Sequence, residues 1–227
     1  MRKDLQDAIA TAIGFFAGSR EPFALLWLDV MHRRFGIPQF ADALQRFDRV
    51  LAEPPPELPL LRVFRRMADR DNPLRLDDMD AVTHPSDRLV VCALYCDRLG
   101  LSPSFFADML DKAANAGGYY LTHALLAVIW MREYGGDVEL PAAFFENLYR
   151  ANAALINADA MTVSDMKLEA AAFLHFAGQG ALVDRTFVES VLRTQAGDGG
   201  WGKSRDGRSD WHATVLALLL LLHATRN

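Results

Sequence analysis

Three residues in the second half of the chain combine donor types that bind transition metals. His123, Glu169 and His212 each lie near the start of an apolar helical segment, roughly 43 to 46 residues apart. Two imidazoles and one carboxylate leave coordination positions for water or substrate, as in catalytic zinc sites and facial-triad iron sites. The pattern therefore predicts a divalent metal, with zinc as the first choice and iron as the alternative.

Four further polar residues flank these predicted ligands: Tyr120, Asp165, Lys167 and Asp210. Such side chains orient metal ligands or transfer protons, so we expect them to act as the catalytic groups. An apolar funnel lined with aromatic residues would suit a small, largely apolar substrate. The residues expected to line it, which could equally be ordinary core, are Ala127, Trp130, Phe173, Phe176, Leu216 and Leu219.

The elements that must position these residues are pairs of helices. Apolar residues recur at helical spacing, and the first helix of each pair is the more apolar. We predict these first helices over residues 23–31, 89–99, 121–131, 168–176 and 214–223, with further helices over 2–17 and 57–69, the latter after the break at Pro54 to Pro56.

A glycine closes the first helix of four pairs. Gly36, Gly100, Gly135 and Gly178 each follow an apolar helix, at the position where a helix end favours a left-handed residue. Stacked helical hairpins form rings or solenoids. The sequence therefore predicts an all-α fold, an α/α toroid that is an incomplete barrel of about 10–11 helices, in a single domain over residues 1–227. A solenoid that does not close is the alternative.

The segment 191–202, VLRTQAGDGGWG, resembles the Q-x-x-D/G-G-x-W signature of the terpenoid cyclase and protein prenyltransferase superfamily. The following residues, KSRD at 203–206 and SDWHATVLAL at 209–218, resemble the zinc-ligand stretch of prenyltransferase β subunits. The resemblance covers about residues 117–223 and implies the toroid fold. It also places His212 on a zinc-ligand histidine of that family.

One repeat earlier, KLEAAAFLHFAG at 167–178 resembles the stretch that carries the other two zinc ligands of that family. Glu169 falls on the aspartate ligand, and Ala171 falls on the cysteine ligand, so the thiolate is absent. His123, which is not a ligand in that family, would restore the number of ligands. Val163 and Met166 replace the basic residues that hold the diphosphate, and this departure argues against prenyl transfer to protein.

Composition excludes several other classes. The net charge of −5 and the absence of a basic run argue against a nucleic-acid partner. The longest apolar run, 215–222, is much shorter than the roughly 20 residues of a membrane helix. The N-terminus does not read as a signal peptide, and Cys92 and Cys96 fit core packing, so we expect a cytoplasmic protein.

The sequence leaves open whether the protein is catalytic and whether it is a monomer. A non-catalytic binding or scaffold protein could keep the toroid without its chemistry, because fold alone does not determine function. An open edge of the toroid could also pair with a second copy of the chain and form a homodimer.

Overall fold

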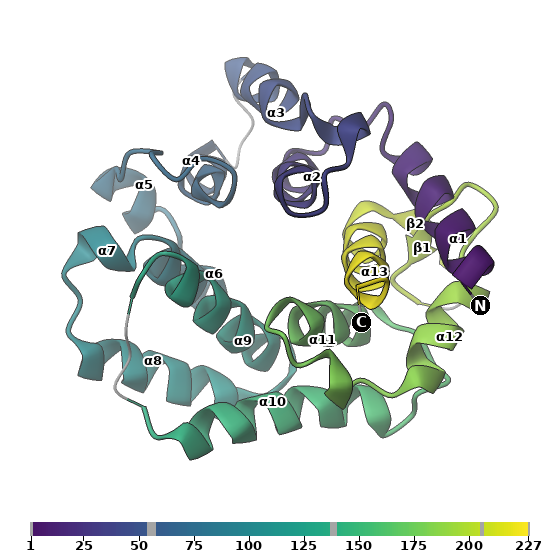
Figure 1. Cartoon of the computed structure of the whole chain (residues 1–227). Helices are drawn as coiled ribbons and strands as arrows, with labels where there is room; N and C mark the ends of the chain where they lie inside the picture. Colours follow the sequence, from purple (N-terminus) through teal and green to yellow (C-terminus); the bar gives the residue numbers. More distant parts are fainter. Residues whose placement is uncertain (1, 54–57, 137–139, 205–206, 227) are drawn as a thin grey trace. The chain divides into compact units, whose positions relative to one another are not determined.

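The computed structural model describes residues 2–53, 58–136, 140–204 and 207–226 (Figure 1). Within these residues the chain forms 13 α-helices, three short 3-10 turns and one pair of two-residue strands, so the predicted all-α class is confirmed. The residues pack as two compact units, residues 1–47 with 152–227 and residues 48–151. The toroid and the single domain stay predictions. Pro54 to Pro56, and Arg205 and Asp206 of the zinc-ligand stretch, lie outside the described residues.

The first unit is built around its last helix. Its elements are α1 (Arg2–Phe15), α2 (Pro22–Phe35), the start of α3 (Ala43–Ala52), the end of α10 (Ala142–Asn157), α11 (Asp165–Phe176), α12 (Arg185–Arg193), β1 (Trp201–Gly202), β2 (Ser209–Asp210) and α13 (Trp211–Ala224). Helix α13 packs against α11, α2 and α1, and it is buried from Ala213 to Leu222 (Figure 1). A helix that is apolar all round must be enclosed in this way.

The turn that leads into α13 is held by Gln195 and Trp201. The Gln195 amide donates to the carbonyl oxygens of Ala8 and Gly199, both at 2.9 Å. The buried indole of Trp201 donates to the carbonyl oxygen of Val191 at 2.8 Å. These bonds connect α1, α12 and the strand pair, so the start of α13 has a defined position within the unit.

The second unit pairs two buried helices with a covering one. Its elements are the end of α3, α4 (Leu58–Phe64), α5 (Leu76–Asp80), α6 (Pro85–Leu94), α7 (Cys96–Leu99), α8 (Pro103–Ala116), α9 (Gly118–Glu133) and the start of α10. Helices α6 and α9 pack side by side, and α8 packs against both (Figure 1). Residues 124–131 of α9 are all buried, whereas α8 buries only Phe106, Leu110 and Ala113.

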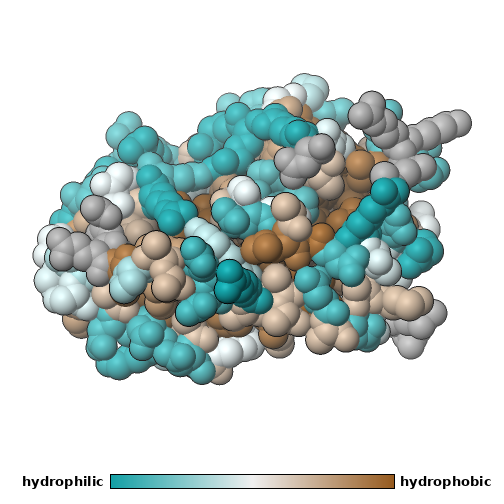
Figure 2. Space-filling view, turned by 60° about the horizontal axis from the view of Figure 1, so that its bottom comes forward, coloured by the Kyte–Doolittle hydropathy of each residue, from teal (hydrophilic) through white to brown (hydrophobic). Residues whose placement is uncertain are grey.

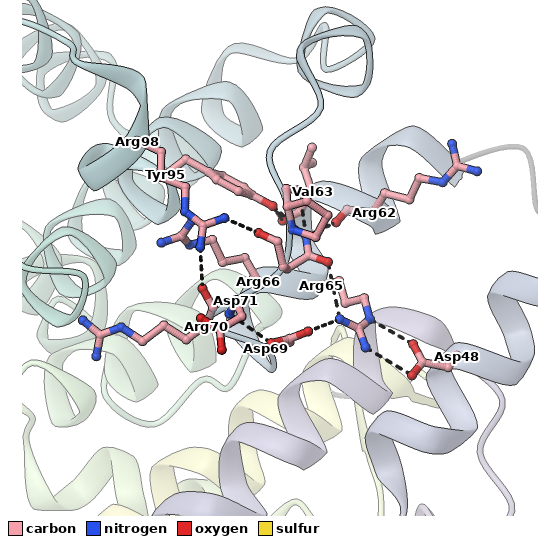
Figure 3. A network of polar contacts seen from close by, with 12 residues as sticks. Asp48, Arg62, Val63, Arg65, Arg66, Asp69, Arg70, Asp71, Tyr95 and Arg98 are labelled. Atoms are coloured by element: carbon pink, nitrogen blue, oxygen red, sulfur yellow. Dashed lines mark hydrogen bonds and ion pairs between the residues drawn. The ribbon is translucent and has the colours of Figure 1, made fainter.

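An arginine-rich network joins α4 to α6 and α7 in this unit (Figure 3). Arg66 is fully buried, and its Nη2 atom lies 2.7 and 2.8 Å from the carboxylate oxygens of Asp97. Its guanidinium group lies 4.6 Å from the ring centroids of both Tyr95 and Tyr134. Two aromatic faces and a carboxylate together compensate for removing this cation from water.

The predicted glycine turns are confirmed. Gly36, Gly100, Gly135 and Gly178 all have positive φ angles between 58° and 76°, which side chains with a Cβ rarely adopt. Each of the first two is the C-cap residue of its helix. The periodic recurrence of these residues in the sequence therefore marks real helix ends.

The predicted number of helices and two of the predicted helix lengths are wrong. The helix expected over 57–69 ends at Phe64 and continues as a 3-10 turn. The helix expected over 89–99 is broken at Tyr95, where φ is −112° and ψ is 20°. The Tyr95 hydroxyl bonds to Asn72 Nδ2 at 2.7 Å and to the carbonyl oxygen of Val63 at 3.2 Å. These tertiary contacts hold the residue at the break, and local helical spacing does not reveal them.

Hydrophilic side chains cover much of the face seen in Figure 2, with hydrophobic ones grouped between them. In the part of the chain that the structure describes, no helix has the length and apolar character needed to cross a bilayer. Cys92 and Cys96 are free thiols; Cys92 is buried, as predicted, whereas Cys96 is partly exposed.

Candidate functional site

Helix α11 begins with two carboxylates on one face. Asp165 is its first residue, and Glu169 follows four residues later, so both side chains lie on the same side of the helix. The backbone N–H of Asp165 donates to the carbonyl oxygen of Lys203 at 3.1 Å. A carboxylate in the first turn is also stabilised by the helix dipole.

His212 lies between these two carboxylates. Its Nδ1 atom is 2.9 and 3.0 Å from the two carboxylate oxygens of Asp165, and its Nε2 atom is 3.6 Å from Oε2 of Glu169. The side chain of Glu169 is 2% exposed and that of His212 is 27% exposed. Solvent or a ligand can therefore reach the imidazole, while Glu169 lies behind it.

The carboxylates change the acidity of the imidazole. Burial alone would lower the pKa of His212, but the hydrogen bond to Asp165 and the charges of Asp165, Glu169 and Asp210 together raise it above 6.5. The protonated form is therefore favoured at pH values where an ordinary histidine is mostly neutral. When the ring is protonated, one N–H bonds to Asp165 and the other faces Glu169.

Asp210 positions His212 by capping the helix. Its carboxylate accepts hydrogen bonds from the backbone N–H of His212 at 2.9 Å and of Ala213 at 3.4 Å. Lys203 pairs with the other oxygen of Asp210 at 3.4 Å. This is an N-cap, which a sequence with aspartate directly before an apolar helix favours. The position explains Asp210 without a chemical role, and its predicted catalytic role stays a prediction.

Two aromatic side chains lie beside the imidazole. The Trp211 ring is 5.2 Å from the His212 ring in an edge-on arrangement, and it stacks on Phe23 of α2 with the centroids 6.4 Å apart. Both aromatic residues are partly exposed. The cluster is thus bordered by an apolar, aromatic surface.

The remaining predicted residues have other surroundings. The Lys167 ammonium donates to the carbonyl oxygen of Asp159 at 2.6 Å. Tyr120 and His123 belong to the second unit. The ring of Tyr120 stacks on that of His84 with the centroids 5.8 Å apart. The Nδ1 atom of His123 lies 2.8 Å from the carbonyl oxygen of Tyr119, and its Nε2 atom lies 3.9 Å from Asp87.

Within the first unit, two side-chain atoms are placed so that they could bind one metal ion. Nε2 of His212 and Oε2 of Glu169 face one another, and Asp165 occupies the other ring nitrogen. Among the described residues, no group of three or more His, Cys, Asp or Glu side chains is arranged to hold a metal ion. His123 lies in the other unit, so its role as the third ligand stays a prediction.

Comparisons of the chain with protein-family models, with curated proteins and with solved structures found no match. The resemblance to the prenyltransferase β subunits therefore depends on the motifs alone.

Sequence reasoning missed two features of this region. It treated Asp165 as one of several flanking groups, although this carboxylate is the direct partner of His212. It assigned no role to Phe23, because the stacking of Phe23 on Trp211 depends on α2 and α13 being neighbours. The i, i+4 spacing of Asp165 and Glu169 was a usable signal for a two-carboxylate face.

Proposed function

We propose that this chain is an enzyme that acts on a small, largely apolar substrate and uses His212 for proton transfer. The observation that carries the proposal is one partly exposed imidazole whose Nδ1 atom bonds to Asp165 while its Nε2 atom lies 3.6 Å from Glu169. A carboxylate on Nδ1 fixes the ring orientation and leaves Nε2 to give or take a proton. Such a geometry is typical of histidines that act as acids or bases.

The protonation state favours a general acid. Because the neighbouring carboxylates raise the pKa of His212, its imidazolium form is stabilised and can donate a proton from Nε2 to a bound substrate. Asp165 then remains on Nδ1–H and keeps the neutral imidazole oriented. Glu169 lies on the Nε2 side, where its carboxylate can stabilise positive charge on the substrate, and solvent can return the proton to the partly exposed ring.

The substrate class follows from the surface beside the imidazole. Phe23 and Trp211 form a partly exposed stacked pair against which an apolar or aromatic body can pack. A substrate held there would place one polar or unsaturated group near Nε2 of His212.

A divalent metal is the second candidate, and one distance favours it. Two ligand atoms of a tetrahedral zinc, each about 2.1 Å from the metal, lie about 3.4 Å apart. Nε2 of His212 and Oε2 of Glu169 are 3.6 Å apart, too far for a hydrogen bond. These two atoms would hold the metal, Asp165 would orient the imidazole, and the bound metal would supply Lewis-acid polarisation or an activated water.

We also propose the α/α toroid for the whole chain. The alternation within each unit of buried helices, such as α9 and α13, with two-faced ones, such as α8 and α12, supports it. The resemblance of residues 191–218 to the prenyltransferase stretch supports it independently. An experimental structure of the chain would test the arrangement directly.

The test uses single variants and a mixture of substrates. Wild-type protein, His212→Ala and Glu169→Ala are incubated with a panel of small apolar alkenes, esters and alcohols, and products are detected by mass spectrometry. His32→Ala is the matched control, because His32 is also a partly buried helix histidine of the first unit, and its Nδ1 atom lies 2.8 Å from a carbonyl oxygen rather than a carboxylate. Metal content is measured on protein purified without added metal.

The outcomes distinguish proton-transfer catalysis, metal-dependent catalysis and non-catalytic binding. The proposal expects a product with wild type and His32→Ala, and a loss of about 100-fold or more with His212→Ala. Stoichiometric metal that disappears in both His212→Ala and Glu169→Ala would favour the metal-dependent version, and full metal retention in His123→Ala would exclude that residue as a ligand. Binding of panel compounds without any turnover would replace the enzyme with a non-catalytic binding protein.

A further inference from the structure

A recess lies in the second unit, and it is lined by residues that are distant in the sequence from the His212 cluster. It is a half-open cavity of about 240 Å³ between the N-terminal ends of α6 and α9 and the C-terminal half of α8. Its lining residues are Pro85, Leu89, Met109, Lys112, Ala113, Ala116 and Tyr120. Five of these seven are apolar, so the cavity fits a mainly apolar molecule.

The size of the cavity sets the size of the occupant. An engineered apolar cavity of about 150 Å³ in another protein binds benzene. A half-open recess of about 240 Å³ therefore accommodates one ring with a short substituent, which is about ten non-hydrogen atoms. The small side chains of Ala113 and Ala116 are what keep this space open.

The polar groups on the lining favour a negative charge at one end of the occupant. The Lys112 ammonium pairs with Asp108 at 2.6 Å on the surface, and both side chains are well exposed, so this ion pair is weak and Lys112 is available to a ligand. Within the described residues, the Tyr120 hydroxyl makes no hydrogen bond and can donate one. Both groups are donors, and no carboxylate lines the cavity.

The helix ends also favour a negatively charged group on the occupant. Pro85 is the first residue of α6, and Tyr120 lies in the first turn of α9, so the positive ends of two helix dipoles meet at the cavity. Neither helix has a side-chain cap: the N-cap residues His84 and Gly117 make no such hydrogen bond. Asp87 lies in the first turn of α6, and its carboxylate is 3.9 Å from Nε2 of His123.

We propose that this cavity binds a small aromatic carboxylate. Its ring lies among Leu89, Met109 and Ala113, and its carboxylate contacts Lys112 and the Tyr120 hydroxyl. The site is independent of the proposed proton transfer at His212, because no residue of that cluster lines the cavity.

The experiment compares two probes of equal shape. Cinnamate and its neutral counterpart cinnamyl alcohol are titrated into the full chain, with binding followed by calorimetry and by backbone amide shifts in NMR. A dissociation constant on the order of 1 mM is expected for cinnamate, given its few atoms. Cinnamyl alcohol is expected to bind at least about fivefold more weakly, with shifts at Leu89, Ala113 and Tyr120 in both cases.

Three variants locate the binding. Lys112→Gln is expected to remove most of the preference for cinnamate, while Arg150→Gln is the matched control because Arg150 belongs to an equally exposed i, i+4 ion pair. Ala116→Phe fills the recess from an exposed position and is expected to weaken both probes at least tenfold. Ala113→Leu repeats this test from the buried side, and circular dichroism checks that each variant is folded.

Several results would overturn the proposal. These are no saturable binding of cinnamate, equal binding of the two probes, or unchanged binding in folded Ala116→Phe and Ala113→Leu. Amide shifts confined to the first unit would place the ligand elsewhere. Because His212→Ala is expected to bind cinnamate normally, failure here and failure of the proposed function are distinguishable.

Discussion

Acid should destabilise the first unit through His223, at the end of α13. The ring of His223 packs between aromatic side chains, 4.9 Å from the centroid of Phe35 and 5.8 Å from that of Phe176. Its Nε2 atom is buried and has no hydrogen-bond partner among the described residues. Burial, followed by the charges of His175, Arg34 and Arg226, lowers the pKa of His223 from 6.5 to about 4.

The direction of the pH dependence follows from this lowered pKa. The unfolded chain takes up a proton on His223 near pH 6.5, whereas the folded chain takes it up only near pH 4. The stabilisation is therefore complete above pH 6.5 and is lost as the pH falls toward 4. At about 1.36 kcal/mol for each pH unit, the upper limit is about 3 kcal/mol. Because the ring is partly exposed, screening by solvent reduces the expected loss to about 1–2 kcal/mol.

The assay is urea unfolding of wild type and His223→Gln at several pH values between 7.5 and 4.5, followed by tryptophan fluorescence. Glutamine keeps a polar side chain but does not titrate, so other titrating groups cancel in the difference between the two proteins. Wild type should lose about 1–2 kcal/mol relative to His223→Gln over this range. A difference that does not change with pH, or a His223 pKa near 6.5 by NMR titration, would refute the reasoning. His84→Gln, at an exposed position of the second unit, serves as the control.

Three further perturbations test other parts of the structure. Gly199→Ala should destabilise the protein by more than about 2 kcal/mol, because φ is +89° and the added Cβ would overlap a backbone carbonyl of α1, whereas Gly197→Ala, with open space around it, should change the thermal midpoint little; equal midpoints would contradict this. Arg66→Ala should cost about 3 kcal/mol in urea unfolding because it removes a fully buried cation from a carboxylate and two rings, and a loss below about 1 kcal/mol would show the network to be weak. Asp165→Asn should lower the pKa of His212 in an NMR titration by removing its hydrogen-bonded charge, and an unchanged pKa would mean that the pair does not form in solution.

Parts of the candidate site could be predicted from the sequence because they depend on local chemistry. Asp165 and Glu169 share a face because a helix repeats every 3.6 residues. Asp210 directly precedes an apolar run, where a helix cap is expected, and it caps that helix. The pairing of His212 with Asp165 joins residues 47 apart in the sequence. It depends on the rotation of α13 against α11, which no local pattern determines.

The sequence by itself determined where the longer helices lie and which of them are buried, because glycines with left-handed conformations and apolar periodicity act within a few residues. Only the tertiary structure decided the break at Tyr95, the aromatic pair beside His212 and the cavity of the second unit. Each of these results from side chains of separate helices meeting, and such contacts depend on how the helices pack rather than on local preference.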